Sequence, residues 1–355
     1  MRYSSSVDIT TRYREIEPYE HRFANPAATT ASHYLTTPQI AARIWAIEDK
    51  IPNGKVTDMS AKRFLVVVNT RGGTRRGVAI LESVKPVFVA AGAELDVRVT
   101  THAGHAKEIA AAVNLESYDG FCVVGGDGTI HEAVGGLMQR DDPSSTPLGV
   151  IPGGTGNSVL QHLECVEPLE AVRRIVTGDV QPLDVMRVST ANEVTYCVNI
   201  VGWGAVADIN VTAERLRAIG ASRYTLAALS HVLRAKRYHA KLVLDDKTTE
   251  GDFVLVIACN TKFTGKGMQM APHADISDGK IDVVVVRHAS RWQVIRMLNK
   301  IYDGSHVSLP CVEYHQVRSF SITSESRDLL NLDGEMKCTT PVSTEIMPGA
   351  LRVFV

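Results

Sequence analysis

The first half of the chain alternates between short apolar runs and amphipathic stretches. The run from Phe64 to Asn69 is continuously apolar until its last residue, which is typical of a strand buried on both faces of a parallel sheet. A regular succession of strand and helix predicts a parallel α/β domain, which we place at residues 62–182. Strands are predicted over 64–69, 95–99, 120–124 and 148–151, and helices up to about residue 91, over 104–114, and through residues 138 and 163.

From about residue 183 the pattern changes to short β-like runs separated by Asp-Gly and Pro-Gly turns. This change predicts a second, mainly antiparallel and β-sandwich-like domain over 183–355. Helical segments near 212–236 and 291–301 interrupt it, and we expect Trp292 in the latter to pack against the core. The predicted strands are 194–200, 240–244, 253–259, 280–287, 317–323 and 350–355.

Residues 1–61 are predicted to be a flexible leader with one short helix. The helix is expected to begin at Thr37, because Pro38 then occupies the first helical position. The leader carries Ser, Thr and Arg like a transit peptide, but acidic residues such as Asp8 and Glu15 argue against that interpretation.

Composition excludes several classes of protein. The net charge is −1 and the pI is about 6.9, so a nucleic-acid partner is not expected. No apolar run reaches the roughly 18 residues of a membrane-spanning helix. The six cysteines form no Cys-x-x-Cys pair, which argues against a zinc ribbon or a disulfide framework and favours a reducing compartment. We therefore expect a cytoplasmic protein.

Three glycine-rich loops follow predicted strands, at 69–73, 125–129 and 153–157. Open α/β sheets bind ligands beyond the carboxyl ends of their strands, and glycine lets a backbone approach a phosphate there. The alternative is that these glycines only serve turns and packing. The spacing of Gly72 and Gly77 matches a P-loop, but Val78 stands where lysine is required, and no G-x-G-x-x-G follows the first strand.

Asp127 is the residue in these loops that most needs an explanation. A carboxylate repels phosphate unless it accepts a proton from an attacking hydroxyl or holds Mg²⁺. The alternative is an Asx-turn or a helix cap. His102, His105 and His131 are expected at loop and helix positions, and not as a metal site.

The two later glycine loops, Gly125-Gly126-Asp127-Gly128-Thr129 and Ile151-Pro152-Gly153-Gly154-Thr155-Gly156-Asn157, resemble the diacylglycerol kinase catalytic-domain superfamily. This superfamily includes sphingosine, ceramide and bacterial lipid kinases. Val68 to Gly73 looks like its opening nucleotide loop, with Thr70 where proline is usual, and the segment 100–108 is similar to its second segment.

Further motifs are most similar to those of sphingosine (long-chain base) kinases. They are Gly202 to Asp208, followed by Arg217 and Arg223, and Leu332-Asp333-Gly334-Glu335 near the end of the sequence. The resemblance covers about residues 62–355, in unbroken order.

The resemblance implies an ATP-dependent lipid kinase that uses Mg²⁺ and phosphorylates the primary hydroxyl of a sphingoid base or a related lipid. Ceramide or diacylglycerol kinase activity is one alternative. NAD kinase, which shares the Gly-Gly-Asp-Gly-Thr loop, and a non-catalytic lipid or nucleotide sensor are two others. Such a protein would be cytoplasmic and would associate peripherally and transiently with a membrane. Its oligomeric state and its metal ligands are not predicted.

By the same resemblance, Asp127 would be the catalytic base on the lipid hydroxyl. Asp208 and Asn210 would contact the substrate, although sphingosine kinases carry an acidic residue where this chain has Asn210. Asp333 and Glu335 would lie near the Mg²⁺ ion. The residues expected to contact the nucleotide are Asn69, Thr70, Arg71, Thr100, Gly125, Gly126, Gly128, Thr129, Glu132, Gly154, Thr155, Gly156, Arg217, Arg223, Asp333, Gly334 and Glu335.

Overall fold

The structure is a computed structural model that describes residues 61–70, 76–215, 236–265, 267–287 and 289–355. Residues 1–60 of the predicted leader lie outside this part of the chain, as do Arg71, Arg217 and Arg223. Among the described helices, none is both long and apolar enough to cross a bilayer.

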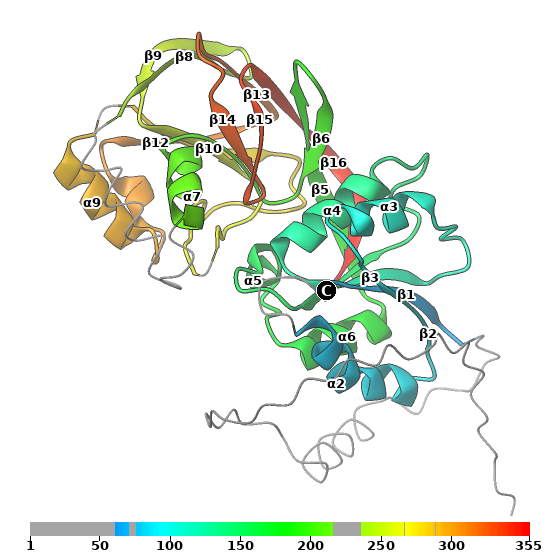
Figure 1. Cartoon of the computed structure of the whole chain (residues 1–355). Coiled ribbons are helices and arrows are strands. Elements are labelled where there is room, and N and C mark those ends of the chain that lie inside the picture. The colour runs from blue at the N-terminus through cyan, green and yellow to red at the C-terminus, as the bar shows by residue number, and fades with distance from the viewer. Residues whose placement is uncertain (1–60, 71–75, 216–235, 266, 288) are drawn as a thin grey trace, which may run out of the picture. The chain divides into compact units, whose positions relative to one another are not determined.

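Four parallel strands form the nucleotide-binding half predicted from the sequence (Figure 1). Their order is β2-β1-β3-β4, and each pairs with its neighbour in parallel register. This confirms the predicted parallel α/β fold. The strands are β1 (Arg63–Val68), β2 (Glu94–Val99), β3 (Gly120–Gly125) and β4 (Leu148–Pro152).

Helices cover both faces of this sheet, which is why its strands are continuously apolar. Leu65 and Val67 of β1 pack in one core with α3 and α4, whereas Phe64 and Val68 pack in another with α2 and α6. Figure 1 shows these two helical layers on opposite sides of the strands. The helices are α2 (Gly77–Ala90), α3 (His105–Ala112), α4 (Asp127–Leu137), α5 (Ser158–His162) and α6 (Pro168–Thr177).

A long two-stranded ribbon continues this sheet into the second domain. β5 (Val180–Thr190) pairs antiparallel with β16 (Val342–Phe354), while Val353 of β16 pairs in parallel with Leu148 of β4. The boundary predicted at residues 182 and 183 therefore falls inside β5, and β16 belongs to both halves. The other strands of this ten-stranded sheet are β6 (Val194–Cys197), β8 (Tyr238–Leu244), β9 (Lys247–Phe253) and β13 (Ser319–Thr323).

A six-stranded antiparallel sheet packs against the far part of the ten-stranded sheet, with the order β12-β11-β10-β7-β14-β15. The core between them contains Trp203, Phe253 and Phe320, which confirms the predicted sandwich. The strands are β7 (Ile200–Gly204), β10 (Leu255–Cys259), β11 (Ile281–Val286), β12 (Val312–Val317), β14 (Leu329–Leu332) and β15 (Glu335–Thr339).

Two α-helices and a 3₁₀ helix complete the described part of the second domain: α7 (Ala205–Arg215), α9 (Arg291–Lys300) and η2 (Ser305–Ser308). Helix α9 matches its prediction and begins with a capping box between Ser290 and Gln293. The expectation that Trp292 packs against the core is wrong, because its side chain is 80% exposed. The residue of α9 that is buried in the core is Met297, and Trp292 lies on the other side of the helix.

Candidate functional site

Two of the predicted glycine loops are in direct backbone contact. A Cβ atom at Gly126 would lie 2.9 Å from the Cα of Gly154, and one at Gly153 would lie 3.1 Å from the Cα of Gly125. The amide of Gly153 also donates to the carbonyl of Gly125 at 2.7 Å. Side chains at these positions would force the loops apart. The glycines thus do serve packing, and this packing brings the ends of β3 and β4 together.

The carboxylate of Asp127 lies where these loops meet. Asp127 is the first residue of α4, and its Oδ1 accepts a hydrogen bond from the amide of Ser158 at 2.7 Å. The Ser158 hydroxyl donates to Oδ2 at 3.4 Å, and a methyl group at Gly156 would collide with the same oxygen. The acid is therefore held beneath the second loop, at the start of α5.

This setting changes the acidity of Asp127. Burial raises its pKa from 3.8 to about 6, the Ser158 amide opposes the rise, and the negative charge of Asp333 adds to it. A carboxyl group with a pKa near 6 is ionised at neutral pH yet basic enough to accept a proton, as general-base catalysis requires.

Amide groups beside Asp127 form a cradle suited to an anion. Within the described part of the chain, the N–H groups of Gly128, Thr155 and Gly156 donate to no acceptor. Gly128 is also in the first turn of α4, where the helix dipole favours negative charge. Free amides near a helix N-terminus are suited to an anion, so these loops are a candidate phosphate site.

The other residues predicted at the strand ends lie around this cradle. The side chain of Asn69 donates to the Thr129 hydroxyl at 2.9 Å, and the amide of Thr100 donates to Val68. Glu132 accepts hydrogen bonds from the amides of Gly104 (2.9 Å) and Ala106 (3.3 Å), so its carboxylate stabilises the start of α3. Thr70 follows Asn69 at the end of β1 and is half-buried.

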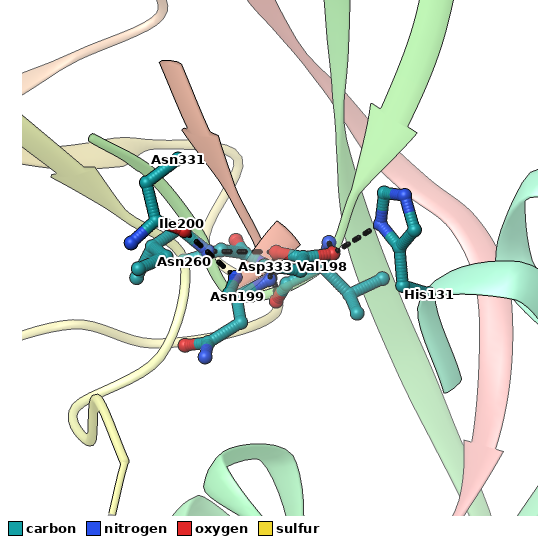
Figure 2. Close-up of polar contacts among 8 residues, drawn as sticks. His131, Val198, Asn199, Ile200, Asn260, Asn331 and Asp333 are labelled. Carbon is teal, nitrogen blue, oxygen red and sulfur yellow. Dashed lines mark hydrogen bonds and ion pairs between the residues drawn. The ribbon is translucent and has the colours of Figure 1, made fainter. Parts of the chain in front are cut away.

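Asp333 is almost fully buried and accepts four hydrogen bonds (Figure 2). Its Oδ1 accepts from the amides of Asn199 and Ile200, each at 2.9 Å. Its Oδ2 accepts from the amide of Val198 at 3.0 Å and contacts His131 Nδ1 at 2.9 Å. A nucleotide or cation at Asp333 would have to displace one of these contacts. In this structure the side chain joins α4, the segment before β7 and the β14–β15 turn.

That turn brings a second carboxylate to the glycine loop 125–129, which carries Asp127. Gly334 donates its amide to Asn331 Oδ1 at 2.8 Å, and the next residue is Glu335. A Cβ atom at Gly128 would lie 3.3 Å from Oε1 of Glu335. Glu335 is exposed, and no described residue donates a hydrogen bond to its carboxylate. It is therefore free to take a ligand beside Asp127.

Two groups of potential metal ligands occur among the described residues, and we assign a metal to neither. His131 and Cys197 group with Asp333, whose oxygens are already hydrogen-bonded. His102, His105 and Glu108 gather at the start of α3, where His102 already contacts Glu108 at 3.5 Å.

The two residues predicted to contact the substrate point to different places. Asp208 accepts hydrogen bonds from Tyr238 at 2.5 Å and from Lys236 at 3.1 Å, next to the start of β8. Asn210 donates its side-chain amide to the carbonyl of Gly334 at 3.5 Å. Asn210 is thus beside the turn that carries Glu335, whereas the charge of Asp208 is paired with a lysine.

Sequence reasoning missed the role of α5. Ser158 contacts Asp127 and also accepts the amide of Gly265 at 3.1 Å. Gln161 donates to the carbonyls of Gly156 (2.5 Å) and Gly265 (2.8 Å), so α5 joins the glycine loop 153–157 to the segment after β10. The available signal was the Gly-x-Gly pattern at 265 and 267, where both glycines have positive φ.

Replacing Ser158 with alanine should raise the pKa of Asp127 further. The substitution removes the hydroxyl that donates to Oδ2 and keeps the backbone amide that donates to Oδ1. Titration of the ¹³C-labelled carboxyl group by NMR measures the change. Ser83→Ala is the control, because the exposed Ser83 hydroxyl donates only to the carbonyl of Ile80 in the same helix, α2. It should leave the titration of Asp127 unchanged. An unmoved or lowered pKa in Ser158→Ala would contradict the described contact.

Asp333→Asn should lower the free energy of unfolding by about 3–5 kcal/mol, as expected when one partner of a buried polar network is lost. His131→Asn should then cost less in the Asp333→Asn background than in the wild type, because the two side chains are in contact. Denaturant titration of the four proteins measures both effects. Asp246→Asn, at an exposed position of the β8–β9 turn, is the control. Strictly additive effects would refute the coupling.

Two family models match successive parts of the chain. The family model for the diacylglycerol kinase catalytic domain matches residues 63–188. The model for the YegS C-terminal NAD kinase beta sandwich-like domain matches residues 199–355.

Named relatives and solved structures match most of this chain. Sphingosine kinase 1 of Arabidopsis thaliana is 27% identical over 352 residues, covering 83% of this chain and 72% of that protein. Diacylglycerol kinase of Bacillus subtilis is 27% identical over 278 residues, covering 77% and 90%. The solved structure of a putative diacylglycerol kinase from Bacillus anthracis str. Sterne superimposes with a TM-score of 0.69 at 25% identity, covering 82% of this chain and 96% of that one. The two models match successive parts of the chain, which therefore carries a diacylglycerol kinase catalytic domain followed by a YegS C-terminal NAD kinase beta sandwich-like domain.

Proposed function

We propose that this protein transfers the γ-phosphoryl group of ATP to the primary hydroxyl of a sphingoid base or a related lipid, at a membrane surface in the cytoplasm. The observation that carries the proposal is the carboxylate of Asp127, held between two glycine loops with its pKa raised to about 6 and with donor amides beside it. This arrangement supports transfer of a phosphoryl group to an alcohol that must lose a proton.

The chain's own groups divide the work between positioning and proton transfer. The N–H groups of Gly128, Thr155 and Gly156 would hold the phosphate tail, and the Ser158 amide fixes the direction of the Asp127 carboxylate. The lipid hydroxyl would then approach Asp127, which accepts its proton as the oxygen bonds to the γ-phosphorus. The bond from that phosphorus to the oxygen bridging the β- and γ-phosphates breaks, and ADP leaves. Phosphoryl transfer has a loose transition state, so alignment and charge neutralisation contribute most of the rate.

Glu335 suits a Mg²⁺ ion better than Asp333 does. Mg²⁺ prefers carboxylate oxygens that keep room for water, and Glu335 has an exposed carboxylate beside Gly128. Both oxygens of Asp333 are already hydrogen-bonded within the protein. When bound, the ion would neutralise charge on the β- and γ-phosphates. Asp333 would act indirectly, because it fixes the turn that presents Glu335.

Asn210 is the residue through which we expect the lipid head group to be distinguished. It lies against Gly334, next to the residue that approaches the catalytic loop. An amide cannot supply the charge that a carboxylate offers to an ammonium group. Asp208 is less suited to this task, because its carboxylate is paired with Lys236. Relatives named sphingosine kinase and diacylglycerol kinase have the same 27% identity to this chain, so their names do not separate the lipids.

Asp127→Asn should lower lipid kinase turnover by roughly 10²–10⁴. The same substitution should raise the melting temperature at neutral pH. The pKa of Asp127 is about 6 in the folded protein, above its usual 3.8. The protonated group therefore stabilises the fold at low pH, and this contribution to the free energy of unfolding is lost as the pH rises through that interval. Radiolabelled ATP with lipid vesicles or with NAD, and calorimetry at pH values on both sides of the interval, measure the two effects.

Asp246→Asn at an exposed turn is the matched control for Asp127→Asn and should change neither property. Near-wild-type turnover in Asp127→Asn would exclude the catalytic role. Phosphorylation of NAD in place of lipid would favour the NAD kinase alternative, and no turnover on any substrate would favour a sensor.

Asn210→Asp should increase activity on sphingosine by about tenfold relative to ceramide and diacylglycerol, since a hydrogen bond to a charged group contributes about 1.5–3 kcal/mol. A kinase assay with the three lipids in identical vesicles measures the ratio. Asn192→Asp adds the same charge at an exposed position outside the site and should leave the ratio unchanged. Equal changes for all three lipids would discard head-group recognition by residue 210.

A further inference from the structure

Helix α9 presents an aromatic and basic face that the fold itself does not use. Trp292 is 80% exposed and Tyr302, just after the helix, is 55% exposed. Arg291 and Arg296 are exposed beside them. No Asp or Glu occurs in the sequence between Asp282 and Asp303, so this whole stretch carries only positive charge.

The helical period separates this face from the core. Trp292, Ile295, Arg296 and Asn299 follow the i, i+3, i+4, i+7 spacing and form one outward stripe. Met297 belongs to the buried core on the opposite side of the helix. An exposed tryptophan at the second position of a well-capped helix costs solubility and gains no packing, so the face has another use.

The arginines of this face are available to a partner. Arg287 is paired with Glu313 at 2.7 Å, and Lys300 donates to Ser305 at 3.0 Å. Among the described residues, no carboxylate lies within ion-pair distance of Arg291 or Arg296. Their charge is therefore unbalanced within the described structure.

We propose that the face of α9 formed by Trp292, Ile295 and Arg296, with Arg291 and Tyr302 at its edges, docks on the anionic surface of a lipid bilayer. Tryptophan and tyrosine favour the boundary between acyl chains and water, and arginine is attracted to anionic head groups. An acidic protein would match the charge but would not explain the exposed tryptophan at the centre of the face. The inference rests on the proposed function, because a lipid kinase must reach a substrate that resides in a bilayer.

Hydrogen bonds connect the chain just after α9 to the segment that contacts Ser158, the partner of Asp127. Beyond α9, the carbonyl of Ile301 accepts the amide of Gln269 at 2.8 Å, and His306 contacts the carbonyl of Met270 at 3.1 Å. The same segment after β10 contributes Gly265, whose amide donates to Ser158, and Ser158 donates to Asp127. Docking through α9 would therefore engage an element whose C-terminal flank is hydrogen-bonded to the segment after β10.

Co-sedimentation with vesicles tests the docking face directly. Phosphatidylcholine vesicles with phosphatidylserine should bind the full-length protein, and vesicles without it should bind less. Arg291→Gln and Arg296→Gln should each weaken binding about fivefold, and Trp292→Ala should weaken it roughly tenfold or more. Raised salt should remove the contribution of the arginines. Val89→Ser, at a 64% exposed apolar position of α2, and Arg318→Gln, at an exposed position before β13, are the controls.

Fluorescence quenching by brominated lipids identifies the inserted side chain. Quenching should be strong in the wild type and largely lost in Trp292→Phe. Equal vesicle binding by Trp292→Ala and the wild type would overturn the proposal. So would concentration-dependent self-association that Trp292→Ala abolishes without affecting vesicle binding, since the face would then serve a second copy of the chain.

Activity on a short-chain lipid dispersed in water separates this inference from the proposed function. The α9 variants should phosphorylate the dispersed lipid at the wild-type rate and lose activity only on vesicles. Equal loss on both forms of substrate would show that α9 serves the fold or the site itself, and would overturn docking. A wild-type protein that binds vesicles through Trp292 but phosphorylates no lipid would overturn the proposed function and leave the docking face intact.

Discussion

The backbone contact between the loops after β3 and β4 is the constraint on which the site depends. Gly126 and Gly154 approach so closely that neither position can carry a side chain. This contact places the Asp127 carboxylate under the amide of Ser158. Burial there raises the pKa of Asp127, and the amide fixes the orientation of the carboxylate. One packing requirement thus fixes both the position and the basicity of the same group.

Three connections link the second domain to the first domain, close to the loops that hold Asp127. Asp333 joins the β14–β15 turn to His131 in α4. Gln161 joins α5 to Gly265 in the segment after β10. The β5–β16 ribbon passes from one half of the chain to the other. The geometry of the loops around Asp127 therefore depends on residues far apart in the sequence.

Much of the first domain could be predicted from the sequence, because strands buried on both faces are continuously apolar and glycine loops follow them. Asp127 could also be identified, because it lies in one of these glycine loops. Strand β9 could not, because it lies at a sheet edge and its residues Lys247 to Glu250 leave no apolar period. The buried hydrogen bonds of Asp333 and the link through Ser158 depend on contacts across 134 and 31 residues, for which local patterns carry no signal. Trp292 was misjudged because hydrophobicity alone does not say which face a helix turns inward.

The course of β16 has a consequence for how the protein is made. Val353 pairs with Leu148 of β4, so the sheet that carries the phosphate-binding loops lacks a neighbour until residues near 353 have left the ribosome. Domains usually fold in the order of synthesis, yet here the strand beside β4 comes from a much later part of the chain. Until that strand is made, the open side of β4 presents unpaired N–H and C=O groups that can pair with strands of other chains.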